Sequence, residues 1–178
     1  MIRKILLTFV MSSIFTGAAF AIQPSIESIR RESDGTSTYF FKIKIDETVK
    51  VEGGTAPPNP DFFTIFNFLG MVPGSEKQPA GWSFSTSTNG VSPIRGGRVI
   101  INPVDTPDIP NLTWSRSGGT LSGPMEISGF SVRTTVAETM VGEYGSQVTR
   151  VKPGTLKPKT VMELKEGRIG AITTPLMP

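Results

Sequence analysis

The chain has 178 residues, a net charge of +3, and neither cysteine nor histidine. It therefore lacks a thiol nucleophile, a cysteine-ligated zinc site and the imidazole that usually serves as general base at neutral pH. Two of its 18 basic residues precede residue 22, which leaves the rest nearly neutral and gives no electrostatic reason to expect nucleic acid as a partner.

Residues 1–21 have the pattern of a secretory signal peptide. Arg3 and Lys4 precede an apolar stretch that ends in the A-x-A-like cleavage site Ala19–Ala21. The stretch is shorter than the roughly 20 apolar residues that span a bilayer. We therefore expect a secreted or extracellular protein, with the periplasm as the alternative and no membrane span after cleavage. Residues 22–178 are expected to form a single domain.

The first predicted element of this domain is a β-hairpin between residues 25 and 46. In TYFFKIKID (38–46), aromatic and isoleucine side chains occupy every second position, as in a half-buried strand. The dipeptide Asp34-Gly35 upstream is typical of a tight turn between two strands.

The residues that follow predict more strands. DFFTIFNFLG (61–70) is apolar on both faces and indicates a strand that is buried on both sides. The further strand candidates are 82–88, 97–102, 111–116, 127–136, 146–152, 159–164 and 168–174. Only AETMV (137–141) fits a helix, of about one turn. The pattern predicts an all-β protein: a single antiparallel β-sandwich, jelly-roll or immunoglobulin-like, of about eight to ten strands.

Eight large apolar residues of these segments are predicted to form the core. They are Phe62, Phe66, Phe68, Trp82, Leu112, Trp114, Phe130 and Val132.

The segment DTPDIPNLTW (105–114) offers a candidate metal site. Asp105, Asp108 and Asn111 supply oxygen ligands of the kind that calcium prefers, although their spacing is not that of an EF-hand. The alternative is structural, because aspartates near prolines cap turns and prolines stiffen a chain. We expect a stiff, extended connector that brings Leu112 and Trp114 inward. We expect no cofactor.

The aromatic residues outside the phenylalanines also have two interpretations. Tyr39, Trp82, Trp114 and Tyr144 would suit a stacking platform for sugar rings, but aromatic residues in strands are more often part of the core. Motifs of nucleophilic hydrolases and of phosphate-binding loops are absent from the sequence. A catalytic pair of carboxylates stays open, because such a pair is spatial.

Six sequence stretches, in their order along the chain, resemble those of a known family. They are DFFTIFNFLG, PAGWSFSTS, DTPDIPNLTWSRSGG, ISGFSVRTT, GEYGSQVTR and GRIGAITTP. Together they resemble a bacterial extracellular domain, without an assigned activity, that occurs in PEP-CTERM proteins, the substrates of exosortase. The resemblance covers about residues 35 to 175 and implies export with a surface or matrix role. The chain ends in TTPLMP without the sorting segment, so we expect free secretion or periplasmic residence.

The sequence thus predicts a secreted, non-enzymatic structural or interaction domain of the bacterial cell surface or extracellular matrix. Its partner would be an extracellular polysaccharide or a surface protein. The alternative is a carbohydrate-binding module or a polysaccharide-acting enzyme on the same scaffold.

Overall fold

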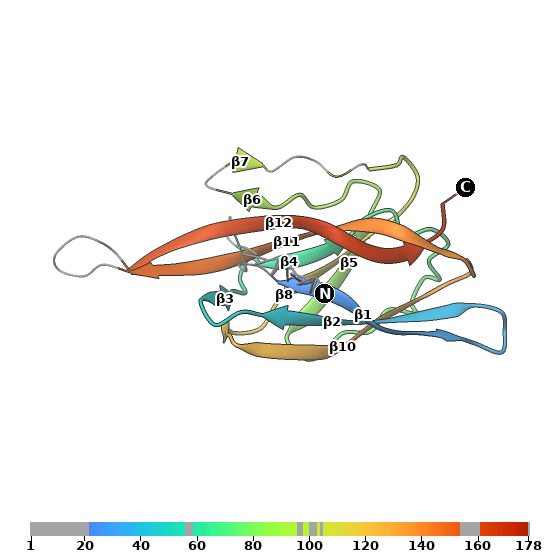
Figure 1. Ribbon diagram of the computed structural model, residues 1–178, viewed down its shortest axis with the longest axis horizontal. Coiled ribbons are helices and arrows are strands. Elements are labelled where there is room, and N and C mark those ends of the chain that lie inside the picture. Colours follow the sequence, from blue (N-terminus) through green and yellow to red (C-terminus); the bar gives the residue numbers. More distant parts are fainter. Residues whose placement is uncertain are drawn as a thin grey trace, which may run out of the picture.

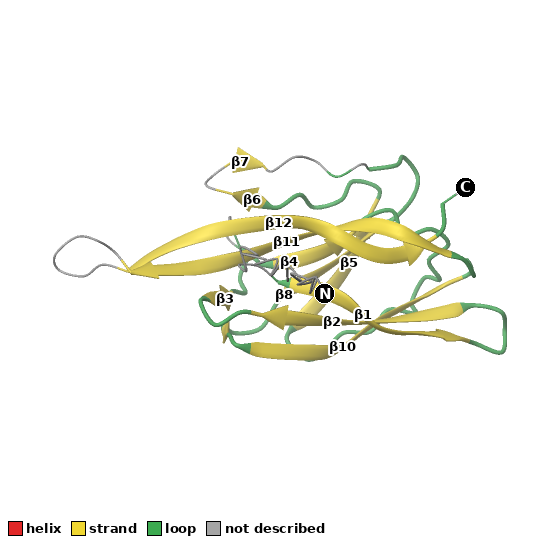
Figure 2. Ribbon diagram, viewed as in Figure 1, coloured by secondary structure: helices red, strands yellow, loops and turns green. Residues whose placement is uncertain are grey.

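The protein is a β-sandwich, which confirms the predicted fold class (Figure 1). The computed structural model describes residues 22–55, 59–95, 98–99, 103, 105–153 and 161–177. Within these ranges the regular structure consists of strands alone, and ten of them form two antiparallel sheets that pack together (Figure 2). The predicted signal peptide, residues 1–21, lies outside the described residues.

The smaller sheet has three strands in the order β1 (Gln23–Arg31), β2 (Ser37–Ile45) and β10 (Met125–Thr134). The first two form the predicted hairpin. Its turn contains Gly35, whose φ of 83° lies in the region that glycine adopts without steric cost. This sheet runs along the lower side of Figure 1.

The larger sheet is built around β11 (Thr139–Pro153) and β12 (Val161–Pro175), which pair along their whole length. On its other edge β11 pairs first with β4 and then with β3. Beyond β4 the sheet continues with β8 and then β5, and beyond β3 it continues with β9. The bounds are β3 Val49–Val51, β4 Phe62–Ile65, β5 Trp82–Ser87, β8 Asn111–Arg116 and β9 Leu121–Ser122, in the order β5-β8-β4-β11-β3-β9.

A separate two-stranded ribbon consists of β6 (Ile94–Arg95) and β7 (Arg98–Val99). Strand β7 falls in the predicted strand 97–102, of which residues 97 and 100–102 lie outside the described residues.

The strand order matches the immunoglobulin-like alternative. The pairings β1-β2-β10 and β12-β11-β4 follow the order of strands A-B-E and G-F-C in an immunoglobulin sandwich. Here β8 and β5 extend the second sheet beyond β4, and the later strand β8 lies next to β4.

Two sequence predictions about the C-terminal half are wrong. The short helix at 137–141 is absent, because β11 begins at Thr139. The described parts of the predicted strands 159–164 and 168–174 belong to one strand, β12, that begins at Val161 and runs through Gly167, whereas residues 159–160 lie outside the described residues. Glycine weakens the interior of a strand. Here Gly167 pairs with Gln147 of the long strand β11, and this pairing keeps β12 extended at the glycine.

All eight predicted core residues are buried. Six of them belong to the main hydrophobic cluster between the sheets, whereas Phe62 and Phe66 lie outside that cluster. Phe63 and Ile65 point into it from β4. Strand β4 is therefore covered on both faces, as its sequence predicted.

The segment 105–114 brings Leu112 and Trp114 into the core as expected, but it is not extended throughout. The N–H of Ile109 donates to the carbonyl of Thr106 at 3.3 Å, and Asp108 has a φ of 68°. Proline at the second position and a positive φ at the third are typical of a type II turn. The aspartate at that third position turns the chain just before β8.

Candidate functional site

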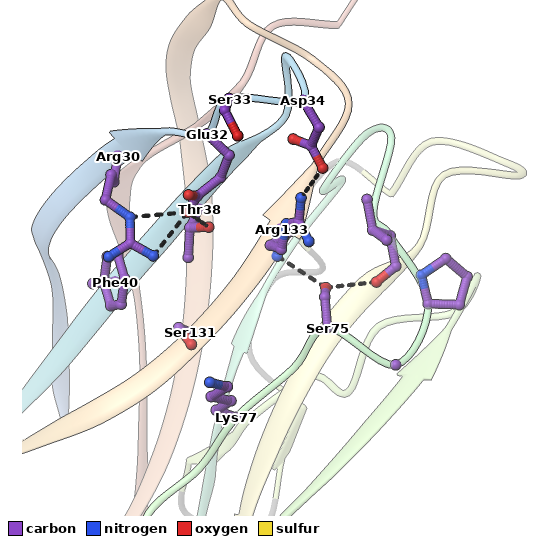
Figure 3. Close-up of a pocket in the computed structure, with 13 residues that line it drawn as sticks. Arg30, Glu32, Ser33, Asp34, Thr38, Phe40, Ser75, Lys77, Ser131 and Arg133 are labelled. Atoms are coloured by element: carbon purple, nitrogen blue, oxygen red, sulfur yellow. Dashed lines mark hydrogen bonds and ion pairs between the residues drawn. The ribbon is translucent and has the colours of Figure 1, made fainter.

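A groove of about 670 Å³ lies on the outer face of the smaller sheet (Figure 3). We call it the basic groove, because three cationic side chains line it. Its lining residues are Arg30, Glu32, Ser33, Asp34, Thr38, Phe40, Val72, Pro73, Gly74, Ser75, Lys77, Ser131 and Arg133.

The strand register explains why these residues meet. Thr38 of β2 is paired with Arg30 of β1 on one side and with Arg133 of β10 on the other. Phe40 is paired with Ser131 in the next outward row. Every second residue of β2, such as Tyr39 and Phe41, points into the core. The residues between them, Thr38 and Phe40, point outward and line the groove.

The far wall of the groove is the loop 71–77, which lies along the free edge of β10. Backbone bonds join Val72 to Arg133 and Lys77 to Ser131, at 2.8 to 3.0 Å. The Ser75 hydroxyl donates to the Val72 carbonyl at 2.6 Å and accepts the Arg133 N–H at 3.0 Å. The loop therefore shields an exposed sheet edge and holds Lys77 next to the strand.

At one end of the groove, Arg30 lies over the ring of Phe40, with its guanidinium carbon 5.2 Å from the ring centroid. The same guanidinium pairs with the carboxylate of Glu32 at 2.9 Å. Hydrogen bonds from the Thr38 hydroxyl and from Arg30 lower the pKa of Glu32. The aromatic contact and the ion pair orient a side chain that is 64% exposed.

In the same row of the sheet, on the far side of Thr38 from Arg30, Arg133 pairs with Asp34 of the β1–β2 turn. Its guanidinium also donates to the hydroxyl of Thr36. Bonds from the Thr36 hydroxyl and backbone N–H, and then from Arg133, lower the pKa of Asp34 to about 2. The turn and β10 are thereby tied together across the groove.

Lys77 is the cation without a counter-charge. Among the described residues, its side chain has neither an ion-pair nor a hydrogen-bond partner. In Figure 3 it lies at the lower end of the groove, beyond Ser131. Its ammonium group is available to an anionic ligand.

This arrangement suits binding better than acid–base catalysis. A glycosidase needs one carboxyl group that stays protonated near neutral pH and so has a raised pKa. Both carboxyl groups of the groove, Glu32 and Asp34, have lowered pKa values and stay ionised. Guanidinium and ammonium groups beside a half-buried ring are typical of sites for carboxylate, sulfate or phosphate groups.

The structure brings two of the three predicted metal ligands together. The Asn111 amide group donates to Asp105 Oδ1 at 2.8 Å and also reaches the carbonyls of Ser87 and Thr88. Asp105 Oδ2 accepts the N–H of Gly90 at 2.8 Å. Both carboxylate oxygens of Asp105 thus already accept N–H groups.

The other polar atoms of this region are also engaged. Asn111 Oδ1 accepts the N–H of Asn67, whose side-chain oxygen accepts the N–H of Thr106. Asp108 is exposed in the turn. Within the described ranges, no three His, Cys, Asp or Glu side chains form a group able to hold a metal ion. The contacts favour the structural interpretation, and calcium binding stays a prediction to be tested.

The predicted sugar platform is not at the surface. Its four aromatic residues belong to the main cluster, with exposed fractions of 5% or less: Tyr39, Trp82, Trp114 and Tyr144. Tyr39 packs against the ring of Phe68, and both Trp82 and Trp114 pack against the ring of Phe130. The half-buried aromatic residue in the basic groove is instead Phe40.

Sequence reasoning missed the basic groove because its cations come from three distant segments. The alternation in β2 placed Phe40 on the outer face, and a similar alternation places Arg133 between two inward residues of β10. These signals identify an outer face. However, the pairing of β10 with the edge of β2 opposite β1 is a long-range feature that no local sequence pattern contains.

Comparisons with known proteins found no relative of this chain. No protein-family model, curated protein or solved structure matches this chain. In the described part of the chain, no helix is long and apolar enough to cross a membrane.

Proposed function

We propose that this protein is an exported, non-enzymatic interaction domain of the bacterial cell surface or extracellular matrix, which binds an acidic extracellular polysaccharide in the basic groove. The signal-peptide pattern of residues 1–21 and the resemblance to the extracellular domain of PEP-CTERM proteins support export. The groove supports the binding role.

One observation carries the proposal: an unpaired cation, Lys77, shares a groove with two arginines that are held in place by their own contacts. Oriented guanidinium groups lose little conformational freedom when they bind a carboxylate. Repeated carboxylates along a polysaccharide would contact Lys77 and the exposed Arg30 together. The half-buried ring of Phe40 offers an apolar surface between them.

The ionised state of the groove carboxylates supports binding without cleavage. Glu32 and Asp34 stay charged through the neutral range, so neither acts as the proton donor that glycoside cleavage needs. Their negative charge also repels acidic ligands that do not reach the cations. The groove therefore favours ligands whose negative charges are spaced like its cations.

The proposal is tested with an array of neutral and acidic polysaccharides, together with a reducing-sugar assay on the same polymers. We expect saturable binding to uronate-containing polymers, weaker binding at high salt, and no release of reducing ends. Release of sugar would assign an enzyme instead. Binding of neutral glycans only, without salt dependence, would reject the basic groove as the site.

A further inference from the structure

Four polar side chains form a cluster on the larger sheet, apart from the basic groove, and two of them, Asp61 and Thr149, are buried. Asp61 lies directly before β4, Glu52 directly after β3, Thr149 in β11 and Lys165 in β12. The side chain of Asp61 is fully buried and that of Lys165 is 10% exposed. The cluster sits where β4 and β3 meet the edge of β11, and Thr149 and Lys165 are partners in the β11–β12 ladder.

The cluster aims the lysine at one oxygen of the aspartate. Lys165 Nζ is 2.8 Å from Asp61 Oδ1, 3.4 Å from Glu52 Oε2 and 2.6 Å from the hydroxyl oxygen of Thr149. The second oxygen, Asp61 Oδ2, accepts the backbone N–H of Glu52 at 2.8 Å and lies 3.0 Å from the hydroxyl of Thr149. The amine thus faces one oxygen. The other oxygen accepts the backbone N–H of Glu52 and lies within reach of the Thr149 hydroxyl, which is also 3.0 Å from Glu52 Oε2.

We propose that Lys165 and Asp61 condense, with loss of one water molecule, into an intramolecular amide bond, and that Glu52 carries the protons for this step. A proton first passes from Nζ to Oδ1 along their hydrogen bond, which leaves a neutral amine and a carboxylic acid. The amine attacks Cγ of Asp61, and a C–N bond forms.

The remaining steps balance within the cluster. Negative charge develops on Oδ2, where the N–H of Glu52 and the Thr149 hydroxyl stabilise it as an oxyanion hole does. Glu52 takes a proton from the nitrogen and gives it to Oδ1. The C–Oδ1 bond then breaks, Oδ1 leaves as water, and the carbonyl reforms at Oδ2. Glu52 returns to its starting state.

Burial favours the protonated form of Asp61, which is the form that the amine would attack. Removal from water raises the pKa of Asp61, although the bonds from Lys165 and from the backbone of Glu52 act against it. In general, removal from water narrows the energy gap between an ion pair and the corresponding neutral acid and amine. Two groups fixed at contact distance also react as if present at about 10⁵–10⁸ M, which offsets the barrier to amide formation.

Distance alone does not identify this pair. Lys50 Nζ lies 2.9 Å from Glu163 Oε1, which is nearly the same separation, but these side chains are 34% and 47% exposed. Water stabilises the charged forms there and keeps the amine protonated, so we expect an ordinary ion pair. This exposed pair is a matched control for the buried one.

The bond would have a clear structural effect. The chain contains no cysteine and so no disulfide. An amide between residues 61 and 165 would close a loop across 104 positions and join β12 to the start of β4. It would tie together strands that are far apart in the sequence, as disulfides do in many exported domains.

The test is mass spectrometry of the purified, folded full chain, followed by tryptic digestion. We expect an intact mass that is lower than the composition requires by one water molecule, and a branched peptide that contains both Asp61 and Lys165. Lys165→Arg and Asp61→Ala should each restore the full mass. Glu52→Gln, which keeps the side-chain size, should remain folded and show the full mass, whereas Lys50→Arg should keep the deficit.

A folded wild-type chain with its full mass, and with Asp61 and Lys165 in separate peptides, would overturn the proposal. A mass deficit that persists in Lys165→Arg would also overturn it, because the lost water would then come from another residue. The wild-type spectrum alone decides the question even where a variant does not fold.

Discussion

Trp114 of β8 stacks on Phe63 of β4, with the ring centroids 5.1 Å apart and 19° between the ring planes. Phe41 of the smaller sheet packs on the same indole ring, with its centroid at 5.7 Å. A single residue therefore contacts aromatic rings from both sheets, and its side chain is fully buried. Trp114 is therefore one of the residues through which the two layers of the sandwich pack together.

The first prediction follows from this packing. We expect Trp114→Ala to lower the free energy of unfolding by about 3–5 kcal/mol, because it removes buried area and leaves a cavity. Trp114→Phe should cost less, since it retains a ring and removes an indole N–H that has no hydrogen-bond partner. Urea denaturation measures both values. Val141→Ala, at a side chain that is 74% exposed, is the control and should leave the midpoint nearly unchanged.

The second prediction concerns the amide of Asn111. Asn111→Asp would place a buried negative charge against Asp105 Oδ1 and two carbonyl oxygens that now accept N–H bonds. The loss of stability should exceed the roughly 1–3 kcal/mol of an unsatisfied neutral group. Thermal unfolding would show this as a large drop in Tm. The same change at the exposed Asn89 should have little effect, and equal effects at both positions would refute the role of this network.

The third prediction separates the stiff turn from a calcium site. Because both carboxylate oxygens of Asp105 accept N–H groups, we expect millimolar calcium and chelator to give the same Tm. Pro107→Ala should lower stability by about 0.4–1 kcal/mol, through the entropy of the unfolded chain. Calcium at a hundredfold excess over its Kd would instead add about 2.7 kcal/mol. A calcium-dependent rise in Tm that disappears when Asp105 and Asp108 are both changed to Asn would establish the metal site.

The fourth prediction is a pH dependence from Asp34. Its pKa is lowered from 3.8 to about 2 in the folded protein, so the folded state favours the charged form more than the unfolded state does. This contribution to stability is complete above about pH 4, the ordinary value, and is lost as the pH falls toward 2. We expect wild type to lose more stability than Asp34→Asn between pH 5 and 2. An NMR titration that places the Asp34 pKa near 4 would contradict this account.

The sequence predicted the features of the fold that depend on local patterns. Alternation in 38–46 identified the inward face of β2, and the two-sided apolar pattern of 61–70 identified a strand covered on both faces. For 105–114 the prolines predicted an extended connector that brings Leu112 and Trp114 inward. The inward direction is confirmed, but the turn with a positive φ at Asp108 was not predicted.

What the sequence could not predict depends on partners that are distant in the chain. Gly167 marks a break by its own preference, yet pairing with Gln147 keeps β12 continuous. Lys77 belongs to a loop without a strand pattern, and only its bridge to Ser131 of β10 brings it to the groove. Neither of these pairings has a local sequence signal.

Binding of an acidic polysaccharide in the basic groove is tested most directly by titrating a uronate polymer against wild type, Lys77→Glu and Lys44→Glu by calorimetry at low salt. Lys44 is exposed on the same outer face of β2, outside the groove, so its reversal makes the same change in net charge. We predict that Lys77→Glu weakens binding about tenfold, or about 1.4 kcal/mol, while Lys44→Glu binds nearly as wild type does. Equal weakening by both variants would mean that overall charge, and not the groove, determines binding, and would contradict the account.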